Sequence, residues 1–197
     1  MRLSTLLLLC LFLFCCTHLT ERTAWRLRVQ EGSIAALSLL LLALSAFPVQ
    51  LSASVSLSPA SLLLLAVSLR LCRGLPDIVE GLLMALLCGV LGWCVYNLLT
   101  VYEMGLLPAL PAALLPWLLG GRKRTALLCA TAAPLFFGLC RTLEDWYLFD
   151  WQVWELGGGI QLDAQMAAIC LLALLWYVPI RRRRPDARPA HPSHETA

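Results

Sequence analysis

Six polar side chains stand within or beside long apolar runs, and their types could support chemistry: Asn97, Glu103, Arg141, Glu144, Asp145 and Asp163. Ionisable groups are costly at membrane depth, so these side chains suggest a functional site, such as one for a cation or a proton. Glu103, Arg141, Glu144 and Asp145 stand at the ends of their runs, where water could simply solvate them. Asp163 follows the start of the last run by about one turn, where it could complement the helix dipole.

The candidate intramembrane polar residues are Asp163, Glu103, Asn97 and Arg141. Because a lipid-facing carboxylate would be unfavourable, we expect Asp163 to point into the protein, toward Asn97 or Arg141. All of these except Asn97 lie toward one side of the expected membrane. The acids among them, together with Glu144 and Asp145, could therefore share an outer vestibule.

No motif for catalysis, nucleotide binding or metal binding is present: GxSxG, HExxH, a P-loop and a dinucleotide fingerprint are all missing. The nine cysteines include no CxxC pair, and Cys15, Cys16 and His18 are too crowded to make a good metal site. Most cysteines lie in apolar runs, where they behave as small hydrophobic residues, so we expect no intramolecular disulfide. The sequence predicts neither catalytic residues nor a metal or cofactor, and we expect no enzymatic activity.

Composition predicts a membrane protein whose main partner is the lipid bilayer. Apolar residues make up 60% of the 197 residues and charged residues only 14%, against about 25% in soluble domains. The mean hydropathy is +0.78. The net charge of +3 does not indicate nucleic-acid binding, because thirteen of the fifteen Lys and Arg residues fall in short clusters between apolar runs.

Seven apolar runs predict an all-α protein, a bundle of about seven transmembrane helices. The runs are residues 3–17, 33–50, 59–71, 81–101, 106–119, 125–140 and 160–179. Gly89 and Gly92 in the fourth run would permit close helix approach. We expect a turn over residues 74–77 and a short helix on the outer interface within 141–159, with Leu143, Tyr147, Trp151 and Trp154 on one face. Residues 1–184 form the transmembrane domain, and residues 185–197 form a disordered cytoplasmic tail.

The basic clusters predict the orientation, because Lys and Arg are enriched in cytoplasmic loops. The anchors are Arg22, Arg26, Arg28, Arg122, Lys123, Arg124 and Arg181, Arg182, Arg183, Arg184. With seven crossings they all fall on one side together with Arg70 and Arg73, leaving Arg2 and Arg141 on the other. We therefore expect a multi-pass protein of the cell membrane, with its N-terminus outside and its C-terminus inside.

The first run permits two interpretations. It could be the apolar part of a cleaved signal peptide, with Arg2 as the basic start. No small-x-small cleavage site follows it, and Arg22, Arg26 and Arg28 oppose export of the next loop. We favour a retained first helix.

Several stretches resemble the YphA-type integral membrane proteins of spore-forming Gram-positive bacteria. They are residues 55–63 (VSLSPASLL), Tyr102-Glu103 before the fifth run, and residues 159–163 (GIQLD) at the start of the last. The resemblance implies a bacterial membrane protein of this topology. It implies no activity.

The sequence therefore leaves two main hypotheses on function. The first is a structural or accessory role in an envelope or developmental process, including sporulation, with a membrane-protein partner or a second copy of the chain. The alternative is a small transporter or permease subunit that uses the acidic outer vestibule. An intramembrane enzyme is a weaker third, because no nucleophile–base pair is evident.

Overall fold

The computed structural model of the chain describes residues 2–16, 31–47, 49–52, 55–72, 74–99, 106, 108–119, 122–149 and 154–177. These residues form seven helices: α1 (Leu3–Cys16), α3 (Glu31–Ser45), α4 (Pro59–Leu71), α5 (Leu75–Leu99), α6 (Ala109–Leu118), α7 (Lys123–Phe149) and α8 (Gly159–Tyr177). They also form three short strands, β1 (Val49–Ser52), β2 (Val55–Leu57) and β3 (Trp154–Leu156). The described chain is therefore mostly helical, and each predicted apolar run overlaps one helix.

Prolines help to fix where two helices begin. α4 begins at Pro59, as predicted, because the first turn of a helix does not need the missing N–H. α5 begins at Leu75, so the turn predicted over residues 74–77 is wrong. Pro76 is tolerated in the first turn of α5, and Asp77 places a favourable negative charge there.

The three-stranded sheet corrects the prediction of an all-α fold. β1 pairs antiparallel with β2, and β2 pairs parallel with β3. α3 ends at Ser45, so the helix predicted to reach residue 50 is too long. The residue before a proline is disfavoured in a helix, and Pro48 follows closely. Beyond it, Val and Leu alternate with Gln and Ser, which is the period of a strand.

The region between residues 141 and 159 also differs from the prediction. α7 continues past Cys140 to Phe149, so Leu143 and Tyr147 belong to its last turns and not to a separate interfacial helix. Trp154 lies in β3, while Trp151 falls outside the described residues. The predicted helical spacing therefore holds for Leu143 and Tyr147 in α7, but not for Trp154.

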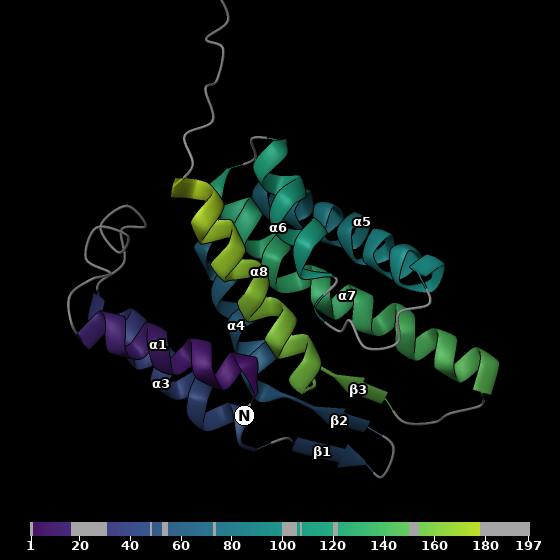
Figure 1. The fold of residues 1–197 in the computed structure, drawn as a ribbon, viewed down its shortest axis with the longest axis horizontal. Coiled ribbons are helices and arrows are strands. Elements are labelled where there is room, and N and C mark those ends of the chain that lie inside the picture. Colours follow the sequence, from purple (N-terminus) through teal and green to yellow (C-terminus); the bar gives the residue numbers. More distant parts are fainter. Residues whose placement is uncertain are drawn as a thin grey trace, which may run out of the picture.

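α7 is the central helix of the fold. It contacts α4, α5, α6, α8 and β3. From Thr125 to Gly138 all of its residues are buried except Leu127 and Phe136, which are half-buried. α5 lies along α7, while α1 and α3 form a pair on the opposite side of the molecule, next to α8 and α4 (Figure 1).

Contacts between helix ends show that α5 and α7 run in one direction and α1, α6 and α8 in the other, since Lys123 at the start of α7 lies 5.7 Å from the ring of Trp176 at the end of α8. The starts of α1 and α8 meet where the Ser4 N–H donates to Asp163. The starts of α5 and α7 meet through the Arg122–Asp77 ion pair. The ends of α6 and α8 meet where Trp117 Nε1 donates to the Leu175 carbonyl, at 2.9 Å.

Small residues allow the helices to pack closely. The core between α5, α6, α7 and α8 contains Ala85, Ala112, Ala113, Ala126, Ala130, Ala133 and Ala168, all at most 1% exposed. A Cβ on Gly89 would lie 2.7 Å from Phe136 Cβ and 3.0 Å from the Ala133 carbonyl oxygen. The prediction that Gly89 permits close approach is confirmed, and the helix that it admits is α7.

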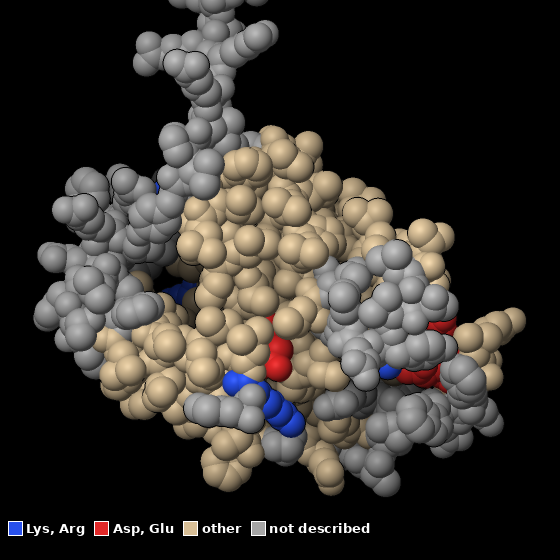
Figure 2. Space-filling view, viewed as in Figure 1, with Lys and Arg blue, Asp and Glu red and all other residues tan. Residues whose placement is uncertain are grey.

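The exterior of the described helices is widely apolar, as on a membrane protein. Exposed leucines and valines lie along α5, including Leu83 (57%), Leu87 (66%) and Leu98 (84%). Figure 2 shows uncharged residues over most of the visible described surface, with charged side chains confined to a few places. Within the described residues, α5, α7 and α8 are long and apolar enough to cross a membrane. α1, α3, α4 and α6 are apolar but shorter.

Candidate functional site

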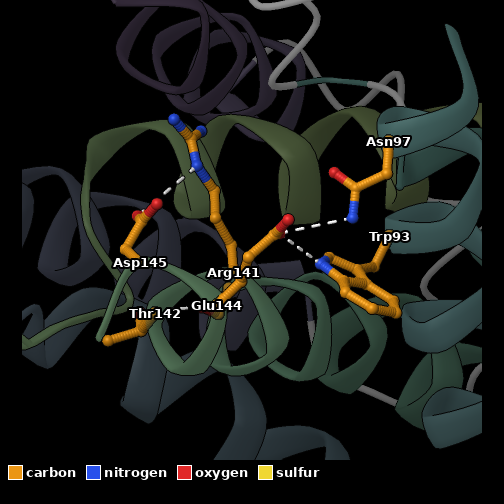
Figure 3. A network of polar contacts seen from close by, with 7 residues as sticks. Trp93, Asn97, Arg141, Thr142, Glu144 and Asp145 are labelled. Carbon is orange, nitrogen blue, oxygen red and sulfur yellow. Dashed lines mark hydrogen bonds and ion pairs between the residues drawn. The ribbon is translucent and has the colours of Figure 1, made fainter. Parts of the chain in front are cut away.

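The main group of polar side chains lies between the last turns of α5 and α7. We call Trp93, Asn97, Arg141, Glu144 and Asp145 the α5–α7 polar cluster. Glu144 accepts a hydrogen bond from Trp93 Nε1 at 2.7 Å and one from Asn97 Nδ2 at 3.3 Å (Figure 3). The structure thus places two of the predicted candidates, Asn97 and Arg141, in the same cluster.

Helical spacing explains how the cluster forms. Trp93 and Asn97 are four residues apart on α5, so both side chains lie on the face toward α7. On α7, Arg141 is followed by Glu144 and Asp145, three and four residues later. Residues at these spacings are neighbours on a helix surface. Glu144 can therefore reach α5 while Asp145 stays beside Arg141 (Figure 3).

Arg141 lies among aromatic rings and one acid. Its guanidinium is 5.4 Å from the centre of the Tyr96 ring, within the range of a cation–π interaction. Tyr96 is in turn edge-to-face with Phe137, with 5.7 Å between the ring centres. Arg141 Nε lies 4.0 Å from Asp145 Oδ2, and both side chains are partly exposed. A guanidinium in this setting can bind an anionic group, while the carboxylates can bind a cation or a proton.

Asp163 occupies a different place from the one that we expected. Its Oδ1 accepts a hydrogen bond from the backbone N–H of Ser4, at 2.7 Å. Its predicted approach to Asn97 or Arg141 is therefore wrong. Ser4 lies in the first turn of α1, whose N–H groups lack partners within the helix, so the carboxylate of one helix caps the start of another.

The other predicted residues divide between described and undescribed parts of the chain. Glu103 lies outside the described residues, as do Arg22, Arg26, Arg28, Arg181 to Arg184 and the tail 185–197. Of the four acids of the predicted vestibule, Glu144 and Asp145 lie on α7 and Asp163 lies on α8. Glu144 contacts α5 and Asp163 contacts α1, so these two acids bond to different helices.

The described topology anchors lie together at the other end of α7. Arg122 pairs with Asp77, which is 7% exposed. Lys123 Nζ lies 5.7 Å from the ring of Trp176, near the end of α8. Burial raises the pKa of the nearby Cys72 thiol, Asp77 raises it further, and Arg124 opposes the shift. The basic residues Arg122, Lys123 and Arg124 thus gather where α5 and α7 begin and α8 ends.

A buried hydrogen-bond network was missed at the level of the sequence. Gln165, 0% exposed, accepts from Ser61 Oγ at 2.6 Å and donates from Nε2 to the Thr131 carbonyl at 2.6 Å. Thr131 Oγ1 lies 2.7 Å from Ser68 Oγ. These contacts join α4, α7 and α8. The sequence did contain a sign of this network, because Gln165 is an amide inside an apolar run. Such residues commonly form hydrogen bonds between membrane helices.

Seven cysteines whose side chains the structure describes are free thiols: Cys10, Cys72, Cys88, Cys94, Cys129, Cys140 and Cys170. The sulfur atoms of Cys88 and Cys129 lie 3.8 Å apart across the α5–α7 interface. Among the described residues, no group of three or more His, Cys, Asp or Glu side chains could hold a metal ion.

Fold and site define a mostly helical protein with helices able to cross a membrane and polar contacts that join those helices. No protein-family model, no curated protein and no solved structure matches the chain. The resemblance to YphA-type proteins stays a prediction.

Proposed function

We propose that the chain is a multi-pass protein of the bacterial cytoplasmic membrane with a structural or accessory role, in which all seven helices are embedded. The observation that carries this proposal is the network of Gln165, Ser61, Thr131 and Ser68. Its buried polar groups are paired with one another across three helices. Such pairing stabilises a fixed helix arrangement, as expected for a scaffold or an accessory subunit.

The helix directions support the embedding, because α5 and α7 run one way and α1, α6 and α8 run the other. Arg122, Lys123 and Arg124 lie at the end where α5 and α7 begin. The α5–α7 polar cluster lies toward the opposite ends of these helices, and Asp163 lies near the start of α8, whose end is beside Lys123. This polarity agrees with a cytoplasmic side at the basic end and with an outer side at the acidic end.

A small transporter or permease subunit is the second candidate. It is favoured by Glu144, a half-buried carboxylate held by Trp93 and Asn97 at the end of two long apolar helices. A carboxylate at this depth could bind a transported cation or proton.

Complementation of a deletion strain distinguishes the two roles. Glu144→Gln keeps the size of the side chain and an oxygen acceptor for Trp93, but it removes the negative charge. If the role is accessory, the Glu144→Gln and Asp163→Asn variants should complement the deletion strain as well as the wild type does, provided that their abundance in the membrane equals that of the wild type. Loss of complementation by Glu144→Gln at normal abundance would overturn the accessory role and favour transport.

A further inference from the structure

Arg141 has more hydrogen-bonding capacity than its described neighbours use. Its Nε is 4.0 Å from Asp145 Oδ2, which is too far for a hydrogen bond. Its other close contact is with the face of the Tyr96 ring. Among the described residues, no acceptor forms a hydrogen bond with its guanidinium, which carries five N–H donors. A partly buried cation in this state is suited to an anionic ligand.

The depth of Arg141 along α7 places it in a headgroup layer if the helix crosses a membrane. Arg141 is 18 residues beyond Lys123 on α7, a rise of about 27 Å. The hydrocarbon core of a bilayer is about 30 Å thick. With Lys123 at one interface, Arg141 therefore reaches the other. Trp146 (51% exposed) and Tyr147 (85%) follow it, as aromatic residues do at membrane interfaces.

Asp145 supplies a negative charge beside Arg141, with which it forms an ion pair at the long distance of 4.0 Å. The side chains of Arg141 and Asp145 are 40% and 34% exposed. Glu144, in contrast, is already bonded to Trp93 and Asn97 (Figure 3). The surface thus presents one cation and one anion a helical turn apart, and Figure 2 shows blue and red surface close together on the side of α5 and α7.

We propose that Arg141 and Asp145 bind the headgroup of a zwitterionic phospholipid with a primary amine, such as phosphatidylethanolamine. The phosphate binds the guanidinium of Arg141, which matches its geometry by paired hydrogen bonds. The ammonium binds the carboxylate of Asp145. The proposal rests on the membrane embedding given under the proposed function and goes beyond it by naming a specific lipid and its site.

The local charges explain the choice of lipid. An anionic lipid without an amine, such as phosphatidylglycerol, would bring its phosphate near two carboxylates, Glu144 and Asp145. Its headgroup has no ammonium that could pair with Asp145. Phosphatidylcholine carries a cation, but its quaternary ammonium has no N–H to donate to Asp145. The site therefore favours phosphatidylethanolamine over both.

Lipid retention by the purified full chain tests the proposal. Native mass spectrometry would compare phosphatidylethanolamine, phosphatidylcholine and phosphatidylglycerol with identical acyl chains. We expect the wild type to retain phosphatidylethanolamine best. Loss of a charge-assisted pair of hydrogen bonds in Arg141→Gln should weaken this retention about tenfold or more. Arg70→Gln is the matched control, because Arg70 is an exposed arginine in the last turn of α4, at the basic end.

The outcomes are distinct. Equal retention of the three lipids by the wild type, or unchanged phosphatidylethanolamine retention by Arg141→Gln, would overturn the proposal. If Arg141→Gln does not fold, Asp145→Asn decides, since it should bind phosphatidylethanolamine no better than phosphatidylcholine. Soluble glycerophosphoethanolamine should not displace the lipid, and displacement would mean that the site takes a free solute. Failure of the membrane embedding itself would show separately, in topology measurements.

Discussion

Gln165 illustrates what individual polar residues contribute to this protein. Its amide is fully buried, yet its oxygen accepts from Ser61 and its nitrogen donates to the Thr131 carbonyl. An unpaired amide in an apolar environment is costly, so these bonds favour one register of α4, α7 and α8 over alternatives.

Replacing Gln165 by leucine should therefore destabilise the helix arrangement. Leu has a similar size but leaves Ser61 Oγ without its acceptor. Hydrogen bonds between membrane helices contribute about 0.6 kcal/mol on average and up to about 1.7 kcal/mol. With two bonds lost, we expect the free energy of unfolding to fall by about 1–2 kcal/mol, measured by denaturation in mixed micelles. Gln50→Leu, on the exposed part of β1, should change it little. Equal loss in both variants would contradict the role of the network.

Asp163 makes a capping interaction that can be tested by two substitutions. Asp163→Asn keeps an oxygen that can accept from the Ser4 N–H and should cost less than about 1 kcal/mol. Asp163→Ala removes the acceptor and should cost about 1 kcal/mol, as for loss of a helix cap. The same denaturation measurement compares them. Equal losses in Asp163→Asn and Asp163→Ala would show that the charge of Asp163, and not its hydrogen bond, matters.

At the scale of elements, the sequence predicted the helices well because apolar length is a strong signal. Charged residues and prolines marked where the apolar runs stop, and a helix was found in each run. The strands were missed because β1 to β3 contain three or four residues each, and their alternation lies between long apolar helices. The partners of Asp163 and Gln165 could not be predicted, because they depend on which helix faces which.

The α5–α7 interface depends on a missing side chain at Gly89. A Cβ there would lie 2.7 Å from Phe136 Cβ and 3.0 Å from backbone of α7, so either helix would have to move. Overpacking of this kind costs about 1–3 kcal/mol, and we expect Gly89→Ala to lower the free energy of unfolding accordingly. Gly32→Ala is the control, because nothing lies within 4 Å of its added Cβ. Unchanged stability of Gly89→Ala would show that the interface is looser than described.

At the scale of the whole molecule, α5 and α7 run in one direction and α1, α6 and α8 run in the other. Contacts at helix starts and ends place Asp77, Arg122 and Trp176 near one end and Ser4 and Asp163 near the other. The charge distribution follows the same division, with Arg122, Lys123 and Arg124 at the first end. The orientation that the basic clusters predict, with this first end in the cytoplasm, stays a prediction.

The central claim is that the membrane separates the start of α8 from the basic residues that follow it. Alkaline phosphatase, which is active only outside the cytoplasm, can be fused after Gly158 or after Arg184. The account predicts high activity for the fusion after Gly158 and none for the fusion after Arg184. The opposite pair of activities, or equal activity at both positions, would contradict the proposed orientation.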